Sequence, residues 1–315
     1  MIKDLKANSN VLDKFLVEKV NQGTASNGAT YLTVTLKDKT GLIEARLWNS
    51  QREDAIRLQA GVIVEINGLV SEYQRSLQVK INNYEIIPLQ EADLNLFVKS
   101  APVSESLMWE QINEFIGEIK NNFWKKIVEE ILKTQQDRFK ISPAAVRHHH
   151  NIHSGLMWHT LTMLQTAKAI CKIYNDRKIN KSLLYAGIIL HDMGKTKELQ
   201  GDLTVEYSLQ GKLIGHISIM AGEIATIGEK LQLDMQQVIL LQHMVLASHG
   251  KNEYGSPVLP QIMEAEILHH IDNLDARIYA IDSGLEQIEN ETFSQRIGGL
   301  ENRSFYRHNY FNSEN

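Results

Sequence analysis

The chain has 315 residues, of which 43% are hydrophobic and 23% charged, and its formal net charge is -5. This composition is typical of a globular protein of two domains, and a single cysteine excludes an internal disulfide. No apolar run approaches the roughly 18 residues of a membrane-spanning helix, and the N-terminus lacks the apolar core of a signal peptide. We therefore expect a cytoplasmic protein with no membrane partner. The acidic balance excludes attraction of nucleic acid through overall charge, so any polyanion must be bound by local groups or metal ions.

Alternation of apolar and polar residues dominates the N-terminal part of the chain. Residues 31–36 alternate strictly, a turn follows, and residues 42–48 resume the alternation, which predicts a β-hairpin. Further β-rich runs at 11–20, 61–70 and 77–87, with a polar, helical segment between the third and fourth runs, complete a set of about five strands. We expect these strands to close into a small all-β barrel that forms the first domain, residues 1–95.

The hairpin pattern Tyr-Leu-x-Val-x-Leu-x-Asp-x-Thr-Gly-x-Ile-x-Ala-x-Leu-Trp resembles the second and third strands of nucleic-acid-binding OB-folds. Tyr31, Arg46 and Trp48 share one face of the predicted hairpin, and Lys80 lies on the corresponding face of a later strand. Aromatic rings that stack on bases, alternating with cations for phosphates, are typical of a groove for single strands. The alternative is an ordinary outer face that the second domain partly covers.

The pattern changes in residues 96–106, where Ser100-Ala-Pro102-Val-Ser104 predicts a linker that ends in a helix cap. Beyond it the apolar period becomes about 3.6 residues, which is the period of an α-helix. Apolar residues at 108–119 and 124–132 predict two successive helices. We therefore expect the second domain, residues 107–315, to be mainly α-helical.

A nearly continuous apolar run at 183–190 is followed at once by His191 and Asp192. Apolar residues all round a helix are typical of a helix buried in a core. Two ionisable groups at its end are costly there unless a partner compensates them. A divalent cation is such a partner, and Gly194 is expected to stop the helix so that both side chains converge on one site.

The histidines crowd into one part of the chain, since all of them except His308 lie between His148 and His270. Candidate ligands stand at or near the ends of helical patterns or in short loops. Several helices could thus bring one or two ligands each to a common point, as in metal sites inside helical bundles. The candidates are His159, His191, Asp192, His216, His243, His249 and Asp272.

The order of these ligands resembles that of the HD-domain metal-dependent phosphohydrolases. The histidine, the His-Asp pair and the distal aspartate of that family are matched by His159, His191, Asp192 and Asp272. His216 and His243 resemble the further ligands of the subset with two metal ions, in which the aspartate of the pair bridges both ions. By the same resemblance, His249 is an additional ligand or a phosphate contact.

The resemblance extends over nearly the whole chain. An OB-like domain followed by Gly155-Leu-Met-Trp-His159-Thr, His191-Asp-Met-Gly-Lys195, Ser248-His-Gly250 and Glu253-Tyr-Gly-Ser-Pro257 is similar to the YhaM family of bacterial 3′-5′ exoribonucleases. That family implies hydrolysis of single-stranded RNA to nucleoside 5′-monophosphates, with manganese as the activating ion. Cobalt, iron and zinc also suit a site rich in imidazole. Single-stranded DNA stays open as a second substrate, because no residue indicates a contact with a 2′-hydroxyl group.

The proposed chemistry is physically sound and gives several residues a role. Two divalent ions roughly 3.5 to 4 Å apart polarise a phosphodiester, activate water and stabilise the leaving oxygen, and Asp192 would hold both. Lys195 would contact a phosphate oxygen, or alternatively cap the C-terminus of the preceding helix. His149, His150 and His153 are expected near the mouth of the site in contact with the phosphate or sugar of the nucleic acid, or in a solvated loop.

Two other functions stay open. The HD-like site could hydrolyse a small nucleotide, although such a substrate does not need a strand-guiding groove. The chain could instead be a nucleic-acid-binding or replication-associated protein with a structural metal site, although many candidate ligands without cysteine favour an open, catalytic site. A homo-oligomer is also left open, with the aromatic run at 305–311 as a candidate docking surface.

Overall fold

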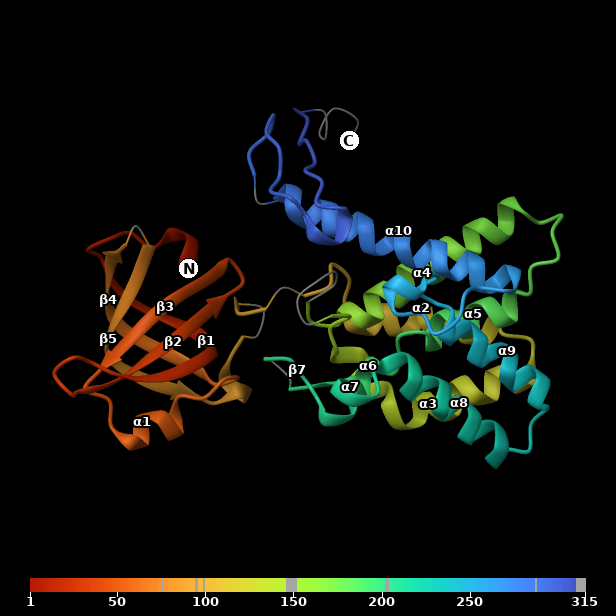
Figure 1. Ribbon diagram of the computed structural model, residues 1–315, viewed down its shortest axis with the longest axis horizontal. Helices are drawn as coiled ribbons and strands as arrows, with labels where there is room; N and C mark the ends of the chain where they lie inside the picture. Colours follow the sequence, from red (N-terminus) through yellow and green to blue (C-terminus); the bar gives the residue numbers. More distant parts are fainter. Residues whose placement is uncertain are drawn as a thin grey trace. The chain divides into compact units, whose positions relative to one another are not determined.

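The structure is a computed structural model that describes residues 1–74, 76–93, 96–98, 100–145, 152–201, 204–286 and 288–309. It divides into two compact units, here called the barrel unit (Met1–Ser100 with Gly201–Glu206) and the helical unit (Ala101–Gln200 with Tyr207–Asn315). Figure 1 shows the all-β and the mainly α-helical architecture of the two units, and the predicted fold class is confirmed. Within the described residues, no helix is long and apolar enough to cross a membrane.

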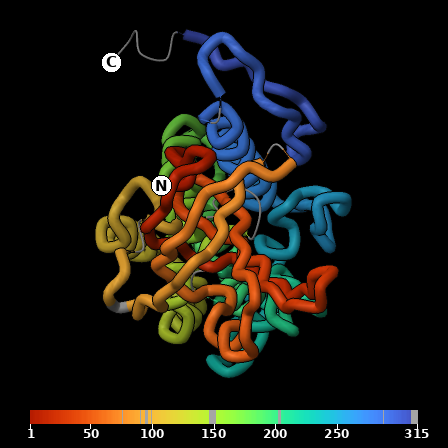
Figure 2. The backbone as a smooth tube through the Cα atoms, turned by 90° about the vertical axis from the view of Figure 1, so that its left-hand side faces the viewer, coloured from red at the N-terminus to blue at the C-terminus, as the bar shows by residue number. Residues whose placement is uncertain are grey.

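The barrel unit is a closed five-stranded barrel whose strands wind about a common axis (Figures 1 and 2). Around the barrel the order is β1-β2-β3-β5-β4, with β3 and β5 parallel and the other pairs antiparallel. The strands are β1 (Asn10–Thr24), β2 (Thr30–Asp38), β3 (Gly41–Trp48), β4 (Ile63–Tyr73) and β5 (Ser76–Ile87). The predicted hairpin is the β2–β3 pair, and the polar segment after it forms helix α1 (Arg52–Arg57).

Strict alternation explains how this barrel closes around its core. Along β2, the side chains of Leu32, Val34 and Leu36 are buried inside, whereas the residues between them lie on the outer face. The same alternation in the neighbouring strands fills the interior with apolar side chains. One face of each strand is therefore left for contacts outside the barrel.

The helical unit surrounds one apolar core. Its main helices are α2 (Glu105–Glu118), α3 (Asn122–Ile141), α4 (Gly155–Ile173), α5 (Lys181–Leu190), α8 (His216–Lys230), α9 (Met235–Leu246) and α10 (Met263–Glu286). Between α5 and α8 lie the short elements α6 (Lys195–Glu198), β6 (Leu199–Gln200), β7 (Glu206–Tyr207) and α7 (Leu209–Leu213). Single 3₁₀ turns occupy Ile2–Asp4, Leu89–Glu91, Asn252–Tyr254 and Gly298–Leu300.

Helix α5 is the buried helix that the apolar run predicts. Each residue from Leu183 to Leu190 is buried, and the helix packs against α3, α4, α9 and α10. It ends at Leu190, so the expected stop at Gly194 is wrong: Gly194 has right-handed backbone angles and precedes α6. Glycine is needed there for another reason, because a Cβ atom would lie 2.2 Å from the carbonyl oxygen of His216. The start of α8 thereby comes close to the end of α5.

Beyond α10 the chain folds back on itself and projects from the end of that helix (Figures 1 and 2). Isolated bridges pair Phe293 with Tyr306 and Ile297 with Arg303, and the Phe293 and Tyr306 rings lie 5.1 Å apart. The aromatic run at 305–311 belongs to this segment as far as residue 309, and its last two residues lie outside the described part of the chain.

Candidate metal centre and nucleic-acid surface

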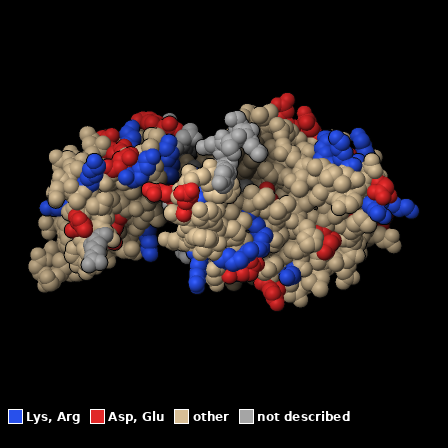
Figure 3. Space-filling view, turned by 90° about the horizontal axis from the view of Figure 1, so that it is seen from above, with Lys and Arg blue, Asp and Glu red and all other residues tan. Residues whose placement is uncertain are grey.

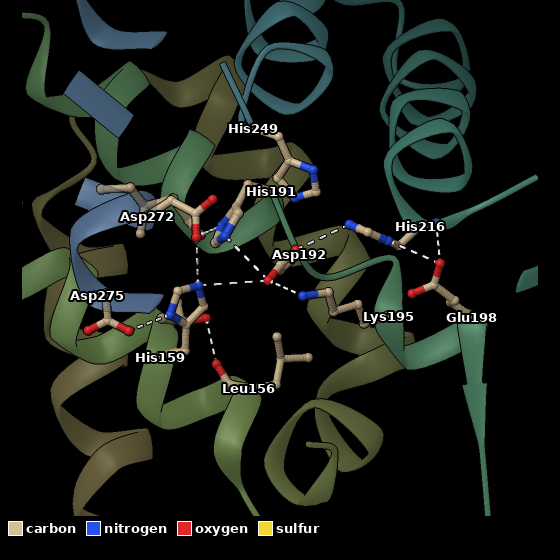
Figure 4. Close-up of polar contacts among 12 residues, drawn as sticks. Leu156, His159, His191, Asp192, Lys195, Glu198, His216, His249, Asp272 and Asp275 are labelled. Atoms are coloured by element: carbon tan, nitrogen blue, oxygen red, sulfur yellow. Dashed lines mark hydrogen bonds and ion pairs between the residues drawn. The ribbon is translucent and has the colours of Figure 1, made fainter. Parts of the chain in front are cut away.

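Helices distant in sequence deliver their polar side chains to one point in the helical unit (Figure 4). The donors are His159 on α4, His191 and Asp192 at the end of α5, His216 at the start of α8, His249 after α9 and Asp272 on α10. Helix ends carry most of them because a residue at an end can point along the helix axis into the bundle. The close approach at Gly194 brings two of these ends together.

A first ligand group consists of His159, His191 and Asp192. The Nε2 atoms of His159 and His191 lie 3.8 and 3.5 Å from Oδ2 of Asp192. Asp272 adds a carboxylate oxygen 3.3 Å from Nε2 of His159. Ligands bound about 2.0–2.2 Å from one ion lie about 3–4 Å from each other, so this spacing suits a single divalent cation.

A second ligand group consists of Asp192, His216 and His249. Nε2 of His216 lies 3.4 Å from Oδ1 of Asp192, and the His216 and His249 rings are 5.6 Å apart. Asp192 therefore belongs to both groups and turns one carboxylate oxygen toward the histidines of each.

The other ring nitrogen of each histidine is engaged by an oxygen. Nδ1 of His159 lies 2.6 Å from Oδ2 of Asp275, and Nδ1 of His191 lies 2.8 Å from the carbonyl oxygen of Ile188. Nδ1 of His216 lies 3.1 Å from Oε1 of Glu198, and Nδ1 of His249 lies 2.9 Å from the carbonyl oxygen of Tyr254. An oxygen acceptor at Nδ1 selects the tautomer that carries its proton there. In its neutral form, each ring then has its Nε2 lone pair available to a metal ion.

Several of these donor atoms are buried without a hydrogen bond. Nε2 of His191, Nε2 of His216 and Oδ1 of Asp192 have no hydrogen-bond partner within the described residues. Buried polar atoms of this kind are costly unless a partner satisfies them. Because the set combines imidazole nitrogen with carboxylate oxygen, it fits a divalent ion such as manganese, iron, cobalt or zinc.

The electrostatics of the first group also favour a cation. Burial opposes protonation of His159, but the carboxylates of Asp272 and Asp275 outweigh it and raise the pKa of His159 to about 10. Burial dominates at His191 and lowers its pKa. At Asp272 the effect of burial is outweighed by the hydrogen bond with His159, which lowers the pKa of Asp272 to about 2. At His159 the ionised carboxylates thus favour positive charge, which a metal ion at Nε2 would supply in place of the proton.

Lys195 lies beside the shared aspartate. It begins α6, and its Nζ atom donates a hydrogen bond to Oδ2 of Asp192 at 2.6 Å. Burial alone would raise the pKa of Asp192, but Lys195 and the neighbouring histidines hold it well below the usual range. Since α5 has already ended at Leu190, Lys195 does not cap that helix.

The remaining predicted residues lie in different places. His243 is on α9 and stands outside both ligand groups; its Nε2 atom accepts a hydrogen bond from the backbone amide of Gln261 at 3.0 Å. The structure thus brings His249, and not His243, next to His216. His149 and the histidines on either side of it lie outside the described residues.

Sequence reasoning assigned no role to Asp275 or Glu198, which orient two of the proposed ligands. Asp275 lies one helical turn after Asp272, so their shared face on α10 was the available signal. No comparable spacing along the sequence connects Glu198 with a predicted ligand. Its carboxylate reaches His216 because α6 and the start of α8 pack together, and the hydrogen bonds from His216 lower the pKa of Glu198 against the opposing effect of burial.

The outer face of the barrel unit gathers aromatic and basic side chains. Tyr31 and Trp48 are direct partners in the β2–β3 pair, with ring centroids 5.0 Å apart. The guanidinium carbon of Arg46 lies 5.7 Å from the Tyr31 ring and 5.8 Å from the Trp48 ring. Lys80 is the partner of Arg46 across the β3–β5 pair. The four predicted residues are therefore neighbours on one surface, here called the barrel face.

Tyr73 on β4 extends this face. The sequence did not predict its place there, because the pattern of its own strand does not indicate which residues of other strands lie next to it. Tyr73 is 53% exposed, and its ring lies 5.8 Å from the guanidinium carbon of Arg46. Glu44 accepts a hydrogen bond from Nε of Arg46 and holds that side chain in place. Figure 3 shows positive and negative side chains interspersed on the visible surface, so attraction of a polyanion would depend on local contacts.

Two family models match the chain: an HD domain over residues 157–277 and an OB-fold nucleic acid binding domain over residues 16–87. Curated relatives named 3′-5′ exoribonuclease YhaM match almost the full chain. The relative from Halalkalibacterium halodurans is 44% identical over 94% of this chain and 92% of its own length. Those from Bacillus subtilis and Listeria welshimeri are 41% and 42% identical, over 93% and 92% of this chain and 93% of each relative.

Proposed function

The chain belongs to the YhaM family of 3′-5′ exoribonucleases, and we propose that it is itself a metal-dependent 3′-5′ exoribonuclease acting on single-stranded RNA. The observation that carries this proposal is the set of buried donor atoms around Asp192, several of which have no hydrogen-bond partner among the described residues. A divalent cation would compensate the cost of burying these polar atoms. The products would be nucleoside 5′-monophosphates, released one at a time.

The proposal includes two divalent ions, manganese being the ion that the family resemblance implies. His159, His191, Asp192 and Asp272 would hold one ion, and Asp192, His216 and His249 the other. The shared carboxylate supports this assignment, because each of its oxygens faces one group. When bound, the ions would supply Lewis-acid activation of the phosphodiester and of water.

The chain's own residues would orient the metal ligands and supply positive charge next to a bound phosphate. Asp275 and Glu198 fix the rings of His159 and His216 through their Nδ1 atoms. Lys195 places an ammonium group 2.6 Å from Asp192 and so supplies positive charge beside any phosphate held at the centre.

The barrel face would bind the strand upstream of the cut. Tyr31, Trp48 and Tyr73 offer exposed or half-exposed rings for stacking, and Arg46 and Lys80 offer positive charge. Stacking on aromatic rings tolerates any base, as a degradative enzyme requires. Stacking also needs unpaired bases, which supports a single-stranded substrate.

The test is an assay with manganese and a 5′-labelled single-stranded RNA, comparing the wild type with Asp192→Asn. Asp282→Asn is the matched control, because Asp282 is an exposed carboxylate on α10. We expect products that shorten progressively from the 3′ end with the wild type and the control, and intact RNA with Asp192→Asn. Bound metal per chain, measured by elemental analysis, should fall in the Asp192 variant alone.

Other outcomes point elsewhere. RNA that is bound but stays intact with manganese, cobalt or iron would identify a binding protein, and RNA neither bound nor cut would direct attention to small nucleotides as substrates. A single-stranded DNA of the same sequence, assayed in parallel, tests whether the site needs a 2′-hydroxyl group.

A further inference from the structure

We propose that Tyr254 and Lys251, on the loop that carries His249, form the subsite for the 3′-terminal nucleotide of the RNA. Tyr254 stacks on the terminal base and Lys251 pairs with a backbone phosphate. The inference rests on the proposed exoribonuclease function and adds to it the part of the helical unit that recognises the end of the strand. The loop, residues 248–256, is called the His249 loop.

The His249 loop ties Tyr254 directly to the candidate metal centre. The carbonyl oxygen of Tyr254 accepts the hydrogen bond from Nδ1 of His249 at 2.9 Å. His249 in turn belongs to the ligand group that contains Asp192 and His216. The backbone of Tyr254 is therefore one hydrogen bond from a proposed ligand, while its side chain is 48% exposed.

Backbone hydrogen bonds stabilise the conformation of the loop. They join Gly250 to Ala247, Lys251 to His249, and both Tyr254 and Ser256 to the carbonyl oxygen of Lys251, with N–O distances of 2.9 to 3.2 Å. Gly250 adopts a φ of +73° and approaches α10 so closely that a Cβ atom would lie 2.3 Å from the His269 ring. Lys251 and Tyr254 are thus presented at a fixed position relative to His249.

The two exposed side chains combine the chemistry that one nucleotide needs. The Nζ atom of Lys251 lies 5.5 Å from the centre of the Tyr254 ring. In the part of the chain that the structure describes, no carboxylate forms an ion pair with Lys251. An aromatic ring stacks on any base, and an ammonium group pairs with any phosphate. A subsite of this kind binds each terminal nucleotide in turn without regard to sequence.

Position assigns this subsite to the terminal nucleotide. An exonuclease holds the last phosphodiester at its catalytic centre, so the terminal nucleoside must lie immediately beside that centre. The His249 loop supplies a ligand to the second group and therefore borders it. The barrel face has stacking groups of its own, which suit the body of the strand.

The experiment measures removal of the first nucleotide from two otherwise identical single-stranded RNAs, one with a normal and one with an abasic 3′-terminal nucleotide. The variants are Tyr254→Ala, Tyr254→Phe and, as matched control, Tyr174→Ala. Tyr174 is also an exposed tyrosine, but it follows α4 at the end opposite His159.

Loss of one base stack should raise the KM of Tyr254→Ala for the normal RNA about tenfold. Tyr254→Phe keeps an aromatic ring and should match the wild type, as should Tyr174→Ala. On the abasic RNA, the wild type and Tyr254→Ala should have equal KM values, because there is no base to stack. Lys251→Gln should raise KM on both RNAs, because its phosphate contact does not need the base.

Bound metal per chain is measured for each variant as a readout independent of activity. Should Tyr254→Ala lose metal, or impair the abasic and normal RNAs equally, the side chain acts through the conformation of the loop that positions His249, and the stacking role is wrong. The role also fails if Tyr254→Ala behaves like Tyr174→Ala. These outcomes leave the exoribonuclease function intact, whereas a wild type that cuts neither RNA overturns that function itself.

Discussion

At the scale of single residues, the candidate centre depends on carboxylates that do not face the shared aspartate. Asp275 contacts Nδ1 of His159 at 2.6 Å and accepts a hydrogen bond from the hydroxyl group of Thr162 at 2.7 Å. Glu198 accepts hydrogen bonds from both the backbone amide and the ring of His216. Two bonds to each carboxylate fix its position, and through it the ring that it orients.

Asp275→Asn should weaken metal binding about 10- to 100-fold, because the amide keeps the shape of the side chain but loses the charge that raises the basicity of His159. Metal titration of the purified variant, followed by calorimetry, measures the change. Asp282→Asn provides the control for loss of a carboxylate from α10. Equal affinity in the Asp275 variant and the wild type would contradict an orienting role.

Glu198→Gln tests the second ligand group separately. The change loosens the ring of His216 and leaves the first group untouched, so we expect bound manganese to fall from about two ions to about one per chain. Elemental analysis after gel filtration gives the ratio. A variant that still retains two ions, or a wild type that binds a single ion, would rule out the two-group assignment.

At the scale of elements, glycines show where helices must approach each other. Gly222 and Gly228 both lie in α8, but the first is exposed with open space around it. The second is buried against α9, where a Cβ atom would lie 2.6 Å from Cγ2 of Val238. The same substitution should therefore have opposite effects at the two sites.

Gly222→Ala should stabilise the protein by about 1 kcal/mol, because alanine has the higher helix propensity and meets no neighbour. Gly228→Ala should destabilise it by about 1–3 kcal/mol, because the added methyl group overfills the contact between α8 and α9. Urea unfolding followed by circular dichroism measures both variants. If Gly228→Ala were as stable as Gly222→Ala, Val238 would have to be free to move aside.

At the scale of the whole molecule, two units with different chemistry share one chain. The barrel face offers stacking and positive charge, while the helical unit holds the donor atoms for metal. If they act on the same RNA, the barrel unit matters only for substrates long enough to reach it. Substrate length then separates their contributions.

Trp48→Ala should raise KM for a long single-stranded RNA about tenfold through the loss of one stacking ring, and should leave hydrolysis of a dinucleotide unchanged. Leu12→Ala, which removes an exposed apolar side chain from β1, is the control. Steady-state kinetics on both substrates provide the measurement. A Trp48 variant that is equally impaired on the dinucleotide would indicate damage to the fold rather than to strand binding.

Periodicity, a local property, was enough to predict the barrel and the helical unit. The alternation of apolar and polar residues along 31–48 is the pattern of a pair of strands with one buried face. The all-apolar run 183–190 is the pattern of a buried helix. Local adjacency also pointed to His191 and Asp192, because two ionisable groups at the end of a buried helix need compensation. These inferences required no knowledge of distant contacts.

Tertiary structure decided which other side chains meet that pair. His243 and His249 are equivalent by residue type, yet the fold brings His249, beyond the end of α9, next to His216, while His243 contacts the backbone of Gln261. Glu198 and Tyr73 gained their neighbours from the packing of α6 on α8 and from the β3–β5–β4 order. Spacing along the chain does not determine such contacts, because they depend on how separate elements approach each other in three dimensions.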